Sequence, residues 1–217
     1  MTKVKICGIT SLDDALTAAE AGADMLGLNF FKQSPRYIKP DAARDLCGGL
    51  RAQLGPACPV LVGVFVNELV SNVSLITSQV GLDFAQLSGD ESDAMVAELH
   101  GIGFKAIRPM NMAMALDDMQ YFRKTMPTNE RAPSLLLDAY HPKLFGGTGE
   151  EANVEVALAV KEQVPRLMLA GGLNPDNVAA RVAAIEPWGV DVASGVESEP
   201  GAKDAALVQA FIAAAKG

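Results

Sequence analysis

Residues 24–66 read DMLGLNFFKQSPRYIKPDAARDLCGGLRAQLGPACPVLVGVFV, and this stretch decides the fold. Its two ends, 24–30 and 59–66, are short apolar runs, which are typical of strands buried on both faces. The segment at 41–54 repeats its apolar residues with helical spacing. Because the return to a parallel strand needs a long crossover, usually a helix, the stretch predicts two parallel strands joined by a helix.

The same alternation continues along the chain. Eight apolar runs predict strands at 4–7, 24–30, 59–66, 83–88, 104–108, 134–138, 166–171 and 189–194. Helical spacing between them predicts helices at 11–22, 41–54, 91–101, 150–163, 175–186 and 203–217, and a methionine-rich packed helix face at 110–120. Eight such units in 217 residues fit a closed barrel better than an open doubly wound sheet, which usually has fewer strands. We therefore predict an α/β fold, a single (β/α)8 TIM barrel, with residues 1–217 as one domain.

Composition excludes several classes of protein. The net charge of −8 argues against a nucleic-acid partner, because such proteins need a cationic face. No apolar run approaches the roughly 18 residues that cross a bilayer, and the N-terminus lacks a secretory apolar region, so we expect a cytoplasmic protein without a membrane partner. Three scattered cysteines, two separate histidines and the lack of a GxGxxG motif predict no disulfide, no metal and no cofactor. Whether the protein is a monomer or a homodimer stays open.

A barrel carries its active site at the carboxyl ends of its strands. Polar residues that end the apolar runs are therefore candidates: Cys7, Asn29, Asn67, Gln86, Ser88, Arg108 and Asp138. Asp138 follows Leu135 to Leu137, and partial desolvation there would keep a proton on the carboxyl group for donation. The alternative is an aspartate that accepts hydrogen bonds from its loop. The segment GGTG at 146–149 is expected to be a mobile loop over the barrel mouth.

Cys7 ends the first strand and is a candidate base. A thiol acts as a base only as the thiolate, which needs nearby N–H groups or cations. Lys5 shares a strand face with Cys7, although the sequence does not show that it assists, and Gly8 is expected to leave room for a ligand. The alternative is a cysteine that is simply a small apolar core residue.

Two glycine-containing loops follow the last two strands. LAGGLNPDNV at 169–178 contains Gly171, Gly172 and Asn174, and VASGVESEPG at 192–201 contains Ser194 and Gly195. Glycines let backbone N–H groups approach phosphate oxygens, a helix N-terminus adds partial positive charge, and barrels often bind phosphate in these two loops. We therefore predict a phosphorylated small-molecule substrate. The alternative is that the glycines only form tight turns.

Six motifs together resemble the phosphoribosylanthranilate isomerase family of tryptophan biosynthesis. They are KICGIT (5–10), SPRY (34–37), VGVFVN (62–67), LLLDAY followed by GGTG, LAGGLNPDNV, and VDVASGVESEPGAKD (190–204). The resemblance spans nearly the whole chain in the right order. It implies an aldose–ketose (Amadori) isomerase that converts N-(5'-phosphoribosyl)anthranilate to 1-(o-carboxyphenylamino)-1-deoxyribulose 5-phosphate. It further implies that Asp138 is the general acid, that Cys7 is the general base, and that Arg36 clamps the anthranilate carboxylate.

The chain also departs from that family's usual pattern. Ser88 stands where the family commonly has histidine, Arg108 is followed by proline instead of the usual Lys-Ala pair, and EEANVEVA replaces a segment with lysine and Phe-Asp-Trp. Two alternatives therefore stay open. One is a related isomerase that acts on another phosphosugar amine, and the other is a non-catalytic barrel that binds a phosphorylated metabolite.

Overall fold

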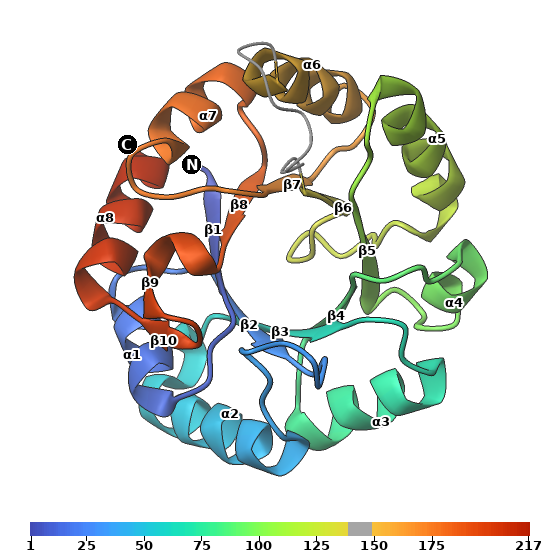
Figure 1. Ribbon diagram of the computed structural model, residues 1–217. Coiled ribbons are helices and arrows are strands. Elements are labelled where there is room, and N and C mark those ends of the chain that lie inside the picture. Colours follow the sequence, from blue (N-terminus) through green and yellow to red (C-terminus); the bar gives the residue numbers. More distant parts are fainter. Residues whose placement is uncertain (139–148) are drawn as a thin grey trace.

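Eight parallel strands close into a barrel in the computed structural model, which describes residues 1–138 and 149–217 (Figure 1). The strands are β1 (Lys3–Cys7), β2 (Met25–Asn29), β3 (Val60–Phe65), β4 (Phe84–Leu87), β5 (Gly103–Ile107), β6 (Leu135–Asp138), β7 (Leu167–Ala170) and β8 (Gly189–Val192). Each strand pairs with the next, and β8 returns to β1. The predicted (β/α)8 barrel is confirmed, and each predicted strand overlaps an observed one.

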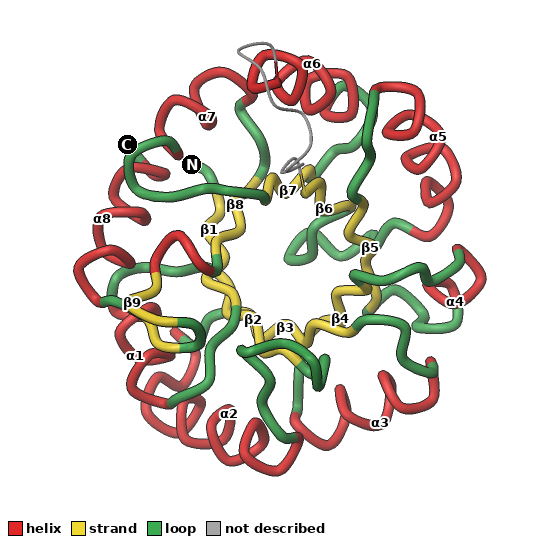
Figure 2. The backbone as a smooth tube through the Cα atoms, in the orientation of Figure 1, coloured by secondary structure: helices red, strands yellow, loops and turns green. Residues whose placement is uncertain are grey.

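Helices form a ring outside the strands (Figure 2). They are α1 (Leu12–Glu20), α2 (Pro40–Leu54), α3 (Val70–Val80), α4 (Asp93–Ala97), α5 (Met112–Phe122), α6 (Gly149–Lys161), α7 (Val178–Ile185) and α8 (Ala205–Lys216). Three short 3-10 helices are η1 (Gly55–Ala57), η2 (Arg123–Thr125) and η3 (Ser194–Val196). Within the described ranges, none of the helices is long and apolar enough to span a bilayer.

The sequence patterns missed two elements. Helix α3 reads VSNVSLITSQV, where β-branched and small polar residues weaken the helical signal. The second is an antiparallel hairpin of β9 (Glu197–Glu199) and β10 (Ala202–Lys203), where the sequence predicts a loop at 192–201 and the start of a helix at 203. The hydroxyl of Thr10 donates a hydrogen bond to the Gly201 carbonyl at 2.6 Å, so the hairpin is held against the loop after β1.

Two layers of apolar side chains explain which strand residues face the site. In β6, Leu135 and Leu137 belong to the layer between strands and helices, whereas Leu136 belongs to the layer inside the barrel. Side chains alternate along a strand, so Asp138 follows Leu136 on the inner side. In β1, Val4 and Ile6 belong to the outer layer. The same alternation turns Lys5 and Cys7 inward.

Candidate active site

The predicted catalytic residues meet in a cavity of about 400 Å³ at the carboxyl ends of the strands. Its polar lining is Cys7, Asn29, Ser34, Arg36, Gln86, Ser88, Arg108, Asp138 and Asp191. Of the polar strand ends named from the sequence, only Asn67 lies outside this lining. Asn67 lines a neighbouring cavity of about 620 Å³, which shares Ser88 and Arg108 with the first but does not contain Cys7 or Asp138.

Cys7 is a buried thiol on β1. Its Sγ lies over Gly27 of β2, where a Cβ atom would come within 2.7 Å of the sulfur. Burial raises the pKa of the Cys7 thiol, while the positive charges of Lys5 and Lys203 act in the opposite direction. At neutral pH the thiol is therefore mostly protonated. The cations expected near Cys7 from the sequence are present, but they lower its pKa by less than burial raises it.

Asp138 projects into the cavity from the end of β6, and its side chain is 25% exposed. The Arg108 guanidinium lies beside it, with Nε 3.2 Å from Oδ2. The carboxyl group therefore borders both the apolar strand β6 and a cation from the end of β5.

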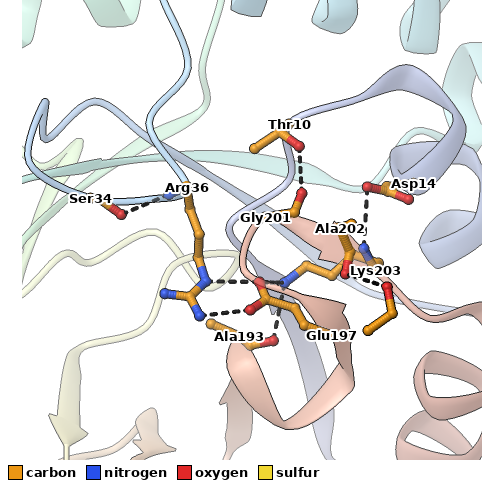
Figure 3. Close-up of polar contacts among 10 residues, drawn as sticks. Thr10, Asp14, Ser34, Arg36, Ala193, Glu197, Gly201, Ala202 and Lys203 are labelled. Atoms are coloured by element: carbon orange, nitrogen blue, oxygen red, sulfur yellow. Dashed lines mark hydrogen bonds and ion pairs between the residues drawn. The ribbon is translucent and has the colours of Figure 1, made fainter.

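Arg36 is fixed by a bidentate ion pair with Glu197 (Figure 3). Its Nε and Nη2 donate to the two carboxylate oxygens at 2.8 and 2.6 Å. The stem of Arg36 lies where a Cβ atom of Gly8 would be. The space beside Gly8 is therefore occupied by the Arg36 side chain, and the room for a ligand expected there stays a prediction.

Glu197 lies between two cations. Its side chain is 4% exposed, and Lys203 Nζ donates to it at 2.7 Å and to the Ala193 carbonyl at 3.1 Å (Figure 3). Burial alone would raise the pKa of Glu197, but hydrogen bonds from Arg36 and Lys203 lower it. The hydrogen bond to Glu197 raises the pKa of Arg36. Because two cations share one carboxylate, the cluster retains positive charge beside the cavity.

The two glycine loops touch one another at the rim. A Cβ atom on Gly195 would overlap the carbonyl oxygen of Leu173, so only glycine permits this approach. Gly171 and Gly172 have φ angles of 98° and 65°, in the region that favours glycine. The cavity reaches Ala170 and Ala193, the residues just before Gly171 and Ser194. These loops therefore border the cavity that contains Cys7.

Asn174 holds the first of these loops in shape. Its Oδ1 accepts hydrogen bonds from the backbone N–H groups of Asp176 and Asn177 at 2.9 and 3.1 Å. Helix α7 starts at Val178, three residues later than the proline that was expected to begin it. The side-chain oxygen of Asn174 is thus used within its own loop, which leaves backbone groups as the anion-binding candidates there.

The sequence did not indicate three charged residues of the site, Asp191, Glu197 and Lys203, and it did not establish a role for Lys5. Lys5 and Asp191 are partners across the β1–β8 pair and are joined by an ion pair of 2.9 Å. The sequence did contain a signal for Lys5 and Asp191, because each is a charged residue at an inward position of an apolar run. Glu197 had no such signal, because it lies in a polar hairpin.

Two further expectations concern metals and the loop after β6. Among residues 1–138 and 149–217, no three histidine, cysteine or acidic side chains are grouped closely enough to hold a metal ion. The expected loop over the barrel mouth, GGTG at 146–149, lies outside the described residues except for Gly149, which begins α6.

Comparisons with known proteins identify the family. Residues 4–214 match the family model described as N-(5'phosphoribosyl)anthranilate (PRA) isomerase. The chain is 45% identical to N-(5'-phosphoribosyl)anthranilate isomerase of Geotalea uraniireducens, with all of both chains covered. The phosphoribosylanthranilate isomerase of Thermotoga maritima has a TM-score of 0.85, with 36% identity and both chains fully covered.

A solved complex adds a ligand-bound relative. It contains phosphoribosylanthranilate isomerase with reduced 1-(o-carboxyphenylamino)-1-deoxyribulose 5-phosphate, and it has a TM-score of 0.83, 35% identity and full coverage of both chains. The TM-scores show that these relatives share the fold of this chain over its whole length. The chain is therefore an isomerase that belongs to the N-(5'-phosphoribosyl)anthranilate isomerase family.

Proposed function

We propose that this protein catalyses the Amadori rearrangement of N-(5'-phosphoribosyl)anthranilate in tryptophan biosynthesis, with Asp138 as general acid and Cys7 as general base. The observation that carries the proposal is that these two groups, from the non-adjacent strands β6 and β1, line one cavity together with Arg36. Residues 1–217 act as one domain, either as a monomer or as a homodimer.

The reaction divides between the two groups. Asp138 donates a proton to the ring oxygen of the ribose, the ring opens, and the anthranilate nitrogen forms a Schiff base with C1'. The Cys7 thiolate then removes the proton from C2', which gives an enolamine that tautomerises to the aminoketose. The product is an isomer of the substrate, so no atoms or electrons enter or leave. A thiolate of raised pKa is a strong base but is present in a small fraction.

Binding groups surround this pair. Glu197 engages Nε and Nη2 of Arg36, and the guanidinium end that includes Nη1 binds the anthranilate carboxylate. Backbone N–H groups of Gly171, Gly172, Ser194 and Gly195 bind the phosphate, in the loop whose shape Asn174 maintains. The positive charge left over at Arg36 and Lys203 supports an anionic substrate at this side of the cavity.

Loss of anthranilate fluorescence tests the proposed function. The purified protein is mixed with freshly generated phosphoribosylanthranilate, and we expect decay well above the spontaneous background. A folded protein that gives no decay contradicts the proposal. Turnover of another phosphosugar amine would then favour the related isomerase, and saturable binding of a phosphorylated sugar without turnover would favour the non-catalytic barrel.

Replacing Arg36 with methionine should mainly weaken substrate binding. The loss of a charge-assisted pair predicts a rise in KM of roughly 10- to 100-fold, with a smaller change in kcat. Steady-state kinetics by fluorescence measures both constants. Arg44→Met is the matched control, because Arg44 is an exposed arginine on α2 that pairs with Asp41. An unchanged KM in Arg36→Met rules out the carboxylate clamp.

Replacing Gly195 with alanine should separate the two phosphate loops. The added methyl group collides with the Leu173 carbonyl, so we expect KM to rise roughly tenfold, which is about 1.4 kcal/mol of lost binding. Competitive inhibition by inorganic phosphate should weaken in parallel. Gly48→Ala on α2 is the control, because nothing lies within 4 Å of its added methyl group. Equal phosphate inhibition in both variants would contradict a phosphate site at these loops.

A further inference from the structure

Lys5 is a fully buried ammonium beneath the cavity. Its side chain is 0% exposed, and it lies on β1 one inward position before Cys7. Lysine is almost never fully buried unless it is paired, because removing a charge from water is costly. The proposed acid–base mechanism assigns no role to Lys5. Its contacts indicate one.

The Lys5 ammonium lies within a cluster of polar groups. Nζ donates to Asp191 Oδ1 and to Gln86 Oε1, both at 2.9 Å, and the Lys5 stem and the Cys7 sulfur both lie against Gly27. Gln86 in turn donates to Ser88 Oγ at 3.1 Å. Burial lowers the pKa of Lys5, but Asp191 and Cys7 more than compensate and raise it. Lys5 is therefore a permanent cation shared between a carboxylate and a thiol.

The charges that face Cys7 come from several elements. Lys5 on β1, Lys203 on β10 and Arg36 after β2 are cations, and Asp191 on β8 is an anion, while Gly27 of β2 lies beside the sulfur. A cation favours the thiolate and an anion disfavours it. Lys5 and Asp191 thus act on the same sulfur in opposite directions.

We propose that Lys5 is a positioning residue whose positive charge, held beside the sulfur at Gly27, stabilises the thiolate of Cys7, with Asp191 as the counter-ion that limits this stabilisation. The inference rests on the proposed function, because it takes Cys7 as the base. Lys5 is not part of the cavity lining, so it acts through Cys7. It sets how much of the base is available and holds the sulfur over Gly27.

The test measures the thiol itself. The wild-type protein, Lys5→Met and Asp191→Asn are treated with iodoacetamide across a pH series, and mass spectrometry quantifies the alkylated Cys7 peptide. Only the thiolate reacts. We expect the pH midpoint to fall by about one unit in Asp191→Asn and to rise by about one unit in Lys5→Met. Below the midpoint, alkylation in Lys5→Met is then about tenfold slower than in wild type.

Two controls keep the result interpretable. Gln86→Leu removes a neutral partner of Lys5 without changing any charge, so its midpoint should stay near the wild-type value. If Lys5→Met does not fold because Asp191 is left unpaired, the double variant Lys5→Met/Asp191→Asn removes both charges, and its midpoint should lie above that of Asp191→Asn. Midpoints that do not move, or that move in the same direction in the two single variants, overturn the inference.

The readout separates this inference from the proposed function. Alkylation reports the Lys5–Cys7 coupling whether or not the protein turns over phosphoribosylanthranilate. If the protein is active, the pH profile of kcat/KM should shift in the same directions as the alkylation midpoints. If the enzyme is active but its alkylation midpoints do not change in either single variant, the proposed function stands and only the role of Lys5 is rejected.

Discussion

Asp138→Asn is expected to lower kcat by roughly 10²–10⁴-fold, the loss that is typical when a general acid is removed. The asparagine side chain keeps nearly the same shape but cannot donate a proton to the ring oxygen as a carboxylic acid does. It also replaces the carboxyl group that lies 3.2 Å from Arg108 Nε. KM should change less, because the proposed role of Asp138 is in the transition state.

The matched control for this prediction is Asp118→Asn. Asp118 lines the neighbouring cavity, so it tests the loss of a nearby carboxylate outside the proposed acid–base pair. Turnover in this variant should stay near that of the wild type. Circular dichroism of both variants establishes that they are folded. Near-normal kcat in Asp138→Asn would exclude Asp138 as the acid.

Cys7→Ala is expected to reduce kcat by a similar factor, about 10²–10⁴-fold, because the proposed base for the C2' proton is then missing. The smaller side chain fits next to Gly27 without a clash. Cys58→Ala is the control, because Cys58 is partly exposed and lies just before β3, outside the cavity lining. Fluorescence decay measures kcat in both variants. Full turnover by Cys7→Ala would assign the proton transfer to another group.

The pH dependence of the wild-type enzyme follows from the same thiol. Burial raises the pKa of Cys7, so the thiolate is scarce at neutral pH and increases as the pH rises towards that pKa. We therefore expect the limb of the kcat/KM profile that reports the base to rise with pH across the neutral range. A profile without a rising limb there contradicts a thiolate base in the free enzyme.

The barrel could be predicted from the sequence because its signals are local. Apolar runs such as 59–66 and helical spacing such as 41–54 depend on neighbouring residues only, and the strict alternation of strand and helix leaves few topologies. Helix α3 was not predicted because its β-branched residues give no clear local helical pattern. Packing against the barrel, which is not a local signal, decides its conformation. The hairpin that contains Glu197 was missed because its residues are polar.

The sequence by itself determined the eight strands of the barrel and which polar residues end them, so Cys7 and Asp138 could be named as candidates at the barrel mouth. Only the tertiary structure decided which charges surround them. Arg36 and Glu197 are 161 residues apart, and Lys5 and Asp191 are 186 apart, yet each pair is in hydrogen-bond contact. The period of a strand fixes the face on which a side chain lies. It does not determine partners on distant strands, because barrel closure and the conformations of the loops bring those charges together.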